Sequence, residues 1–218
     1  FLEQWIAQGL GWKKVGSGSY PIDVYSDTLL CGADVKFVSA EVDENNNFTS
    51  RQSGESSLGQ KFRGSGNELD QDFAKREYAK IVNGWKDILI EKIKRPIEEY
   101  GLKNIYYFIF IRGGNSISLA IANVKFDEIK NIEVGRATSD SVFVDNYIED
   151  AYGNVKIYKA KKRMELRCFP KKMKEDDLLI EWKFDNLNTS KGINLRSIVS
   201  NNQFNNHIKE QTRKFFNL

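Results

Sequence analysis

The sequence predicts a mixed α/β protein whose helices flank a mixed central β-sheet, with a β-rich part at the C-terminal end. Three observations carry this prediction. Apolar residues recur at helical spacing between Phe73 and Ile93, and residues 105–111 are apolar on both faces, as in a strand covered on both sides. Short runs with strand-like alternation then dominate residues 142–184.

Length and composition favour a single domain over residues 1–218. The chain is 40% hydrophobic and 12% aromatic, enough to bury a sizeable core. It has no apolar run of about 18 residues and no signal-peptide pattern at its start, so we expect a soluble, cytoplasmic protein with no membrane partner. The formal charge is only +3, so attraction to phosphate must depend on how the charges are distributed.

The counts of cysteine and histidine exclude several kinds of site. Cys31 and Cys168 are expected to be reduced thiols, because no secretion signal precedes them. Zinc sites need Cys/His clusters that these residues and the single histidine, His207, cannot supply. The chain also lacks the Gly-x-Ser-x-Gly elbow of many hydrolases. A site built from carboxylates and lysine passes this test.

The first part of the chain is predicted to form a helix and two strands. Apolar residues at helical spacing mark a helix around residues 2–6, and a Gly/Ser-rich turn follows at residues 16–19. Strands are predicted at residues 20–25 and 33–37. Their apolar sets are Tyr20, Ile22 and Val24, and Ala33, Val35 and Phe37. Alternation therefore places Asp23, Asp34 and Lys36 on the opposite faces.

A polar segment and a long helix follow. Residues 44–70 are rich in Asn, Ser and Gly and predict a long loop, of the kind that is usually functional or mobile. The helix over residues 73–93 should kink or restart at Pro96 and end at Gly101. The remaining predicted elements are strands at residues 105–111, 117–126, 155–158 and 178–184, a turn at 112–115 and a helix at 204–216.

Asp23, Asp34 and Lys36 form a set suited to phosphodiester hydrolysis. The reaction requires an activated water and stabilisation of developing negative charge, which hard divalent cations can supply. Such cations prefer carboxylate oxygens, and the two aspartates could converge from neighbouring strands. Lys36 shares a strand face with Asp34, where it could orient or deprotonate the attacking water.

Pro21-Ile22-Asp23 followed by Asp34-Val35-Lys36 resembles the PD-(D/E)xK motif of the restriction-endonuclease-like superfamily, with one residue inserted between Pro and Asp. The order of predicted elements over residues 1–126 also resembles the core of that family. The resemblance implies that Asp23 and Asp34 bind Mg²⁺, with the carbonyl of Val35 as a further ligand. It implies that Lys36 positions the nucleophile.

The resemblance also suggests a role for Glu3 and a division of the chain. Many members carry an acidic residue on the helix before the motif, and Glu3 is the candidate here; a surface location explains it equally well. Residues 1–126 would then form a restriction-endonuclease-like catalytic core. Residues 127–218 would be a β-rich part that supplies nucleic-acid contacts or a dimer surface.

Two regions are candidates for nucleic-acid contacts. In the polar segment the candidates are Arg51, Gln52, Lys61 and Arg63. The second region is the basic tract of residues 156–172, which holds eight Lys or Arg against one Glu, and its candidates are Lys159, Lys161, Lys162 and Arg163. A solvated edge strand protected by lysines is the alternative explanation of that tract.

These observations favour a Mg²⁺-dependent endonuclease acting on double-stranded DNA, similar to a type II restriction enzyme. Cutting both strands of a symmetric site would require a homodimer. One alternative is a repair or toxin nuclease of the same fold, acting on other DNA or on RNA. Another is a module of this fold that binds nucleic acid without cleaving it.

Overall fold

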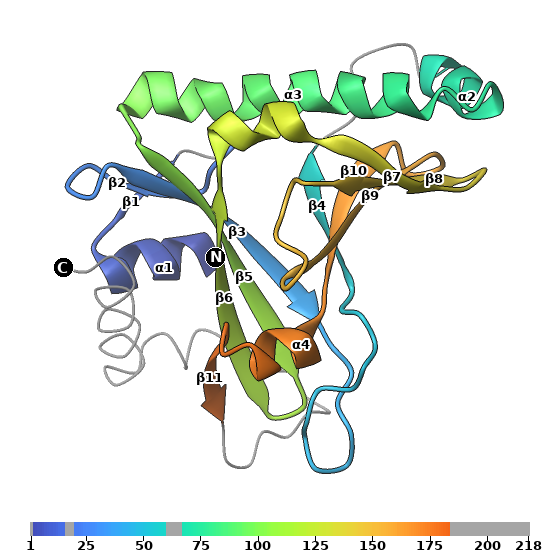
Figure 1. The fold of residues 1–218 in the computed structure, drawn as a ribbon. Helices are drawn as coiled ribbons and strands as arrows, with labels where there is room; N and C mark the ends of the chain where they lie inside the picture. Colours follow the sequence, from blue (N-terminus) through green and yellow to red (C-terminus); the bar gives the residue numbers. More distant parts are fainter. Residues whose placement is uncertain (1, 16–19, 60–66, 184–218) are drawn as a thin grey trace.

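The computed structural model describes residues 2–15, 20–59 and 67–183, which form two β-sheets (Figure 1). The first has the order β1-β2-β3-β5-β6-β11, with β1 Lys13–Lys14, β2 Val24–Ser26, β3 Cys31–Ser39, β5 Asn104–Gly113, β6 Ser116–Val124 and β11 Ile180–Lys183. β3 and β5 are parallel, and the other neighbouring pairs in this sheet are antiparallel. The predicted α/β class with a mixed sheet is confirmed.

The second sheet is antiparallel throughout and has the order β4-β10-β9-β8-β7. Its strands are β4 Glu55–Gly59, β7 Glu133–Ala137, β8 Ser141–Asp145, β9 Gly153–Tyr158 and β10 Arg163–Cys168. β4 comes from the first half of the chain, whereas β11, near the end of the described residues, joins the first sheet. A division at residue 126 therefore does not coincide with the division between the sheets.

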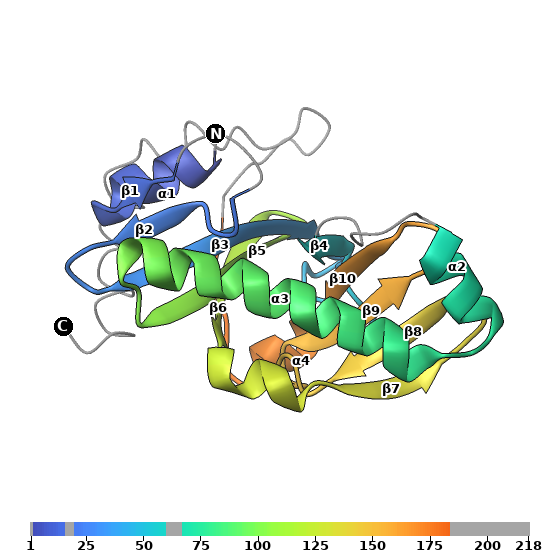
Figure 2. The ribbon, with the colours of Figure 1, turned by 90° about the horizontal axis from the view of Figure 1, so that it is seen from above.

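Helices lie on both faces of the first sheet. The helices of the described residues are α1 Leu2–Leu10, α2 Asn67–Ala74, α3 Tyr78–Tyr100, the 3₁₀ helix η1 Phe126–Asn131 and α4 Pro170–Glu175; α1 and α3 lie on opposite faces of the first sheet, and α2 lies beside the second (Figure 2). Alternate residues of β5 pack into different clusters: Tyr106, Phe108 and Phe110 with Ile6 and Ala7 of α1, and Ile105, Tyr107 and Ile109 with the apolar face of α3. Figures 1 and 2 show α3 running along both sheets, so one long helix covers a face of each.

The apolar stripe of α3 is buried as predicted, but the helix boundaries differ. Trp85, Leu89 and Ile93 are each at most 1% exposed. Gly101 ends the helix in the left-handed conformation with φ 64°, which glycine adopts without strain. The helix continues through Pro96 to Tyr100, because burial of the proline ring offsets the hydrogen bond that proline cannot donate.

Two predictions for the first half of the chain are corrected. The strand at residues 20–25 is only Val24–Ser26, since Asp23 lies in a bend after Pro21. That bend sends Ile22 into the cluster on the α3 side and Val24 into the cluster on the α1 side, so these two residues do not share a face. The segment 44–70 is not one long loop either, because it contains β4 and the start of α2.

The basic tract is a hairpin followed by α4, and its strands β9 and β10 are internal to the second sheet. The alternative of a solvated edge strand is therefore wrong. The turn at residues 16–19 and the helix at 204–216, with His207, lie outside the described residues. Cys31 and Cys168 are both buried free thiols, as expected. None of the described helices is long and apolar enough to cross a membrane.

Candidate active site

Asp34 and Lys36 lie on the face of β3 that is turned towards α3. Successive strand residues point to opposite faces, and Val35 between them packs against the cluster on the α1 side. The side chains of Asp34 and Lys36 are only 8% and 14% exposed. Nζ of Lys36 lies 2.6 Å from Oδ1 of Asp34. The alternation predicted for this strand thus produces a largely buried ion pair.

Asp23 reaches the same strand from the bend before β2. Its Oδ2 accepts a hydrogen bond of 2.7 Å from the backbone N–H of Val35. β2 pairs with β3 only from Cys31 to Ala33, which leaves the next residues of this edge accessible to a side chain. The N–H and C=O of one strand residue point to the same edge, so the carbonyl of Val35 is also directed towards the Asp23 side.

The surroundings of Asp23 raise its pKa from 3.8 to about 6. Burial is the largest cause, because it disfavours the charged carboxylate. The Val35 N–H and Lys36 act in the opposite direction, whereas the negative charges of Asp34 and Glu3 raise the pKa further. Asp23 therefore lies within electrostatic reach of all the other charged residues predicted for the site.

Glu3 occupies the edge of this cluster. It lies in the first turn of α1, its side chain is 37% exposed, and its Oε2 is 3.8 Å from Nζ of Lys14. Its electrostatic effect on Asp23 is the smallest of those acting on that carboxyl. Glu3 is thus near the site and accessible to solvent, and its contact with Lys14 is that of a surface ion pair.

Lys92 of α3 belongs to the cluster and was missed by the sequence analysis. Its Nζ lies 3.2 Å from Oδ2 of Asp34 and donates a hydrogen bond of 2.7 Å to the carbonyl of Leu58 in β4. Burial lowers the pKa of Lys92, partly offset by Asp34, and the nearby positive charge of Lys36 lowers it further. One feature of the sequence could have indicated Lys92. It falls on the buried stripe of α3, where an unpaired lysine would be costly, so a carboxylate partner is expected.

The donor set is compatible with Mg²⁺. Mg²⁺ is usually bound by one or two carboxylates and completes its octahedron with water and substrate phosphate. Asp23 and Asp34 supply two carboxylates, and the Val35 carbonyl is directed to the same edge. Within the described residues, no group of three or more His, Cys, Asp or Glu could hold a metal ion. Both oxygens of Asp34 contact lysines, so a cation there must compete with an ammonium group.

No family model, curated protein or solved structure matches this chain. The geometry of the site itself is therefore what points to a function. That geometry gathers two carboxylates and two lysines from a bend, a strand and a helix.

The candidates in the polar segment are only partly described, and the two that are described, Arg51 and Gln52, make no hydrogen bond or ion pair with Asp23 or Asp34. Arg51 is exposed and its Nη1 lies 2.6 Å from Oε2 of Glu41, while Gln52 is half-buried in the same loop. Lys61 and Arg63 lie outside the described residues. Among the described residues of this segment, β4 reaches the site, because the carbonyl of Leu58 accepts a hydrogen bond from Lys92.

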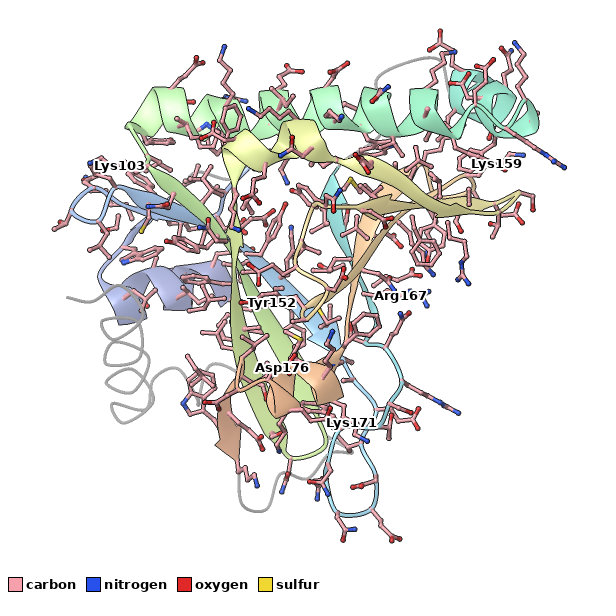
Figure 3. All side chains as sticks on the ribbon, in the orientation of Figure 1. Lys103, Tyr152, Lys159, Arg167, Lys171 and Asp176 are labelled. Carbon is pink, nitrogen blue, oxygen red and sulfur yellow. The ribbon has the colours of Figure 1, made fainter. Side chains whose placement is uncertain are left out.

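The candidates in the basic tract cluster around the β9–β10 turn. Lys159, Lys161 and Lys162 lie in the turn, and Arg163 begins β10. Lys161 contacts Glu55 and lies 3.1 Å from Oε2 of Glu165, so much of its charge is neutralised. Figure 3 shows Lys159 at the outer end of the second sheet. Nζ of Lys162 lies 3.6 Å from Oδ2 of Asp70, and this contact connects the turn to α2.

Two tyrosines, one buried and one partly buried, lie next to Asp34. Tyr107 of β5 is the register partner of Asp34, and its hydroxyl lies 2.5 Å from that of Tyr147. Burial raises the pKa of both phenols, and the charge of Asp34 adds to the effect. Tyr147 also lines a cavity of about 560 Å³ between η1 and residues 146–150. That cavity is not lined by Asp23, Asp34 or Lys36, so it is separate from the candidate site.

Proposed function

We propose that this chain is a Mg²⁺-dependent endonuclease of the PD-(D/E)xK type that hydrolyses phosphodiester bonds of double-stranded DNA. One observation carries the proposal. Asp23 and Asp34 meet at the same part of β3, where the Val35 N–H holds Asp23, Lys36 contacts Asp34, and the charge of Asp34 acts on Asp23. The order α1, β2, β3, α3, β5 supports a restriction-endonuclease-like core, since it is the order on which the resemblance rests.

The residues would share the chemistry as follows. Asp23, Asp34 and the Val35 carbonyl would hold the metal ion, which supplies Lewis-acid stabilisation and a more acidic bound water when present. Lys36 is near enough to Asp34 to keep a water or a phosphate oxygen oriented beside the carboxylates. The positive charge of Lys92 would lie behind Asp34 and help to balance the negative charge gathered there. Glu3 would act on the site through its charge, which already raises the pKa of Asp23.

The test is incubation of the chain with mixed duplex DNA, with Mg²⁺ and with EDTA, followed by sequencing of the ends. We expect cleavage only with Mg²⁺. Asp34→Asn should abolish it and leave DNA binding unchanged or tighter, because the variant lacks a metal ligand and a negative charge beside phosphate. Lys36→Ala should abolish turnover as well. Parental activity in Asp34→Asn would refute the metal assignment.

Cut-end mapping also decides between the alternatives. A short palindromic pattern would support a restriction enzyme that acts as a homodimer, because two-fold symmetry of the protein matches that of the site. Unspecific cutting, or cutting of RNA, would indicate a repair or toxin nuclease. A non-catalytic binding module is favoured by one observation, the occupation of both Asp34 oxygens by lysines. Binding without cleavage under all metal conditions would establish that function instead.

A further inference from the structure

The face of the second sheet that points away from α3 carries a row of basic and aromatic side chains. Val142, Val155 and Ile157 point inward and belong to the core cluster that packs on α3. The residues that alternate with them, Phe143, Lys156 and Tyr158, therefore point outward and are partly exposed. Arg136 of β7 joins them. We call Arg136, Phe143, Lys156 and Tyr158 the basic aromatic row.

Contacts within the row hold its cations in place. The Phe143 ring has the guanidinium of Arg136 at 4.8 Å and the ammonium of Lys156 at 4.3 Å from its centroid. Phe143 and Lys156 are direct register partners on neighbouring strands. The Tyr158 ring lies 6.0 Å from Nζ of Lys156. Aromatic rings attract cations through their negative faces. The rings of Phe143 and Tyr158 therefore hold Arg136 of β7 and Lys156 of β9 in place on either side of β8.

No carboxylate in the part of the chain that the structure describes neutralises these two cations. Among the described residues, neither Arg136 nor Lys156 makes an ion pair. Glu165 is the register partner of Lys156 on β10, but its carboxylate is 3.1 Å from Lys161. Burial lowers the pKa of Lys156, and the positive charges of Arg167 and Arg136 lower it further. The positive charges of Arg136, Lys156 and Arg167 thus lie close together on this face and repel one another. A bound anion would relieve that repulsion.

We propose that the basic aromatic row is a contact surface for the sugar–phosphate backbone of DNA, with Arg136 and Lys156 each contacting a phosphate. This inference extends the proposed nuclease function, because it adds a binding surface to the candidate active site. Three neighbouring strands span roughly 10 Å, which is wider than a single small anion. Several phosphates of a duplex lie within that distance. An extended polyanion is therefore the partner that the row fits.

Strand β4 connects this face to the candidate active site. Glu55 of β4 contacts Arg167 and Lys161 beside the row, and Figure 3 shows Arg167 on the side of the sheet away from α3. Three residues further along β4, the carbonyl of Leu58 accepts the hydrogen bond from Lys92, which also contacts Asp34. One short strand thus contacts both the basic face and the lysine–carboxylate cluster.

The experiment measures binding of a fluorescent 30-base-pair duplex to the full chain in EDTA, over a range of salt concentrations. Arg136→Gln/Lys156→Gln should weaken binding about tenfold or more near 0.1 M salt. It should also reduce the magnitude of the slope d log K/d log[salt] by about two, because two phosphate contacts are lost. Lys94→Gln/Lys103→Gln is the matched control, since it removes two exposed charges from α3 and the turn after it. Its slope should stay near the parental value.

A charge-preserving variant tests whether weaker binding comes from the lost charges or from misfolding. Arg136→Lys/Lys156→Arg keeps both cations, so it should retain most of the parental slope, and circular dichroism should show all variants folded. The proposal is overturned if the Gln double variant binds DNA like the control. It is also overturned if that variant loses binding to poly-L-glutamate but not to DNA, which would indicate an acidic protein partner.

The outcome is separable from that of the proposed function. If no DNA is cleaved but the slope changes as expected, the nuclease proposal fails and the binding surface stands. If DNA is cleaved and the slopes are equal, the binding surface alone fails.

Discussion

The ammonium group of Lys92 lies 3.2 Å from Oδ2 of Asp34 and thereby ties α3 to the centre of β3. The other oxygen of the same carboxylate is held by Lys36 at 2.6 Å. Two lysines more than offset the charge of this one carboxylate in a largely buried setting, where an unpaired charge would be costly. The same arrangement places Lys92 in competition with any metal ion at Asp34.

Replacing Lys92 should therefore strengthen metal binding while weakening the fold. In Lys92→Met we expect a 5- to 30-fold gain in affinity for Ca²⁺, used as a probe, because about 1–2 kcal/mol of repulsion between partly screened charges is removed. We also expect a loss of about 1–3 kcal/mol in the free energy of unfolding, since the carbonyl of Leu58 loses its donor. Calorimetric titration and urea denaturation measure the two effects.

Lys80→Met provides the matched control for this prediction. Lys80 lies on the same helix and its Nζ is 2.7 Å from Oδ1 of Asp72, another buried carboxylate, away from the candidate site. We expect it to leave Ca²⁺ affinity at the parental value. A similar gain in both variants would mean that Lys92 acts only through the overall charge.

Local alternation predicted part of the site correctly because it depends only on neighbouring residues. Asp34 and Lys36 lie on the expected face of β3, since every second residue of a strand shares a face. The same rule failed at Ile22 and Val24, where the bend at Asp23 interrupts the strand. Lys92 could not be assigned to Asp34, because that contact depends on how α3 packs across the sheet.

Long-range strand pairing explains the other differences. β4 has the polar sequence Glu55-Ser56-Ser57-Leu58-Gly59 and is a strand because it pairs with β10, more than a hundred residues later. An edge strand was the alternative explanation of the basic tract, because lysines protect such an edge from pairing. Its hairpin is instead internal, between β4 and β8. Neither partner can be inferred from a window of neighbouring residues.

Asp23→Asn should stabilise the protein at high pH and have little effect at low pH. The pKa of Asp23 is raised from 3.8 to about 6 in the folded state. The protonated form is thus favoured by folding, and its contribution is present below pH 4 and lost as the pH rises through 6. The full shift corresponds to about 3 kcal/mol, and solvent screening of this partly exposed group reduces it to about 1–2 kcal/mol. In EDTA at pH 8, we expect Tm to rise by about 3–6 °C.

Asp43→Asn is the control of opposite sign. Backbone N–H groups of Asn47 and Asn45 lower the pKa of Asp43, so its contribution is present at neutral pH and lost on acidification. Neutralising Asp43 should therefore give no gain in Tm at pH 8. Thermal melts of both variants from pH 4 to pH 8 decide the matter. A constant difference between Asp23→Asn and the parent across that range would contradict the prediction.

The pair Tyr107 and Tyr147 should show strong coupling in a double-mutant cycle. Tyr147→Phe leaves the Tyr107 hydroxyl buried without its partner, so we expect a loss of about 1–2 kcal/mol in the free energy of unfolding. Tyr107→Phe should cost less, since Tyr147 borders the cavity, where water can replace its partner. The double variant should be about as stable as Tyr107→Phe. Additive losses in urea denaturation would exclude a shared hydrogen bond.

The basic residues of the β9–β10 turn fall into two groups, those that can contact DNA and those that form ion pairs within the protein. Among the described residues, no ion pair involves Lys159 or Arg163, whereas Lys161 contacts both Glu55 and Glu165. Lys159→Ala/Arg163→Ala should therefore weaken binding to all duplexes and reduce the salt slope by up to about two, with little change in stability. The preferred cutting site should stay the same, because phosphate contacts position a protein without reading bases.

Lys161→Ala should behave in the opposite way. It leaves Glu165, which is 5% exposed, without its cation, so we expect a loss of about 1–3 kcal/mol in the free energy of unfolding and a salt slope changed by less than one. Urea denaturation and binding of the fluorescent duplex at several salt concentrations measure both quantities for the two variants. If Lys161→Ala reduced the slope as much as the double variant, Lys161 would have to leave its glutamates to reach phosphate. The turn would then rearrange on binding DNA rather than present its charges in place.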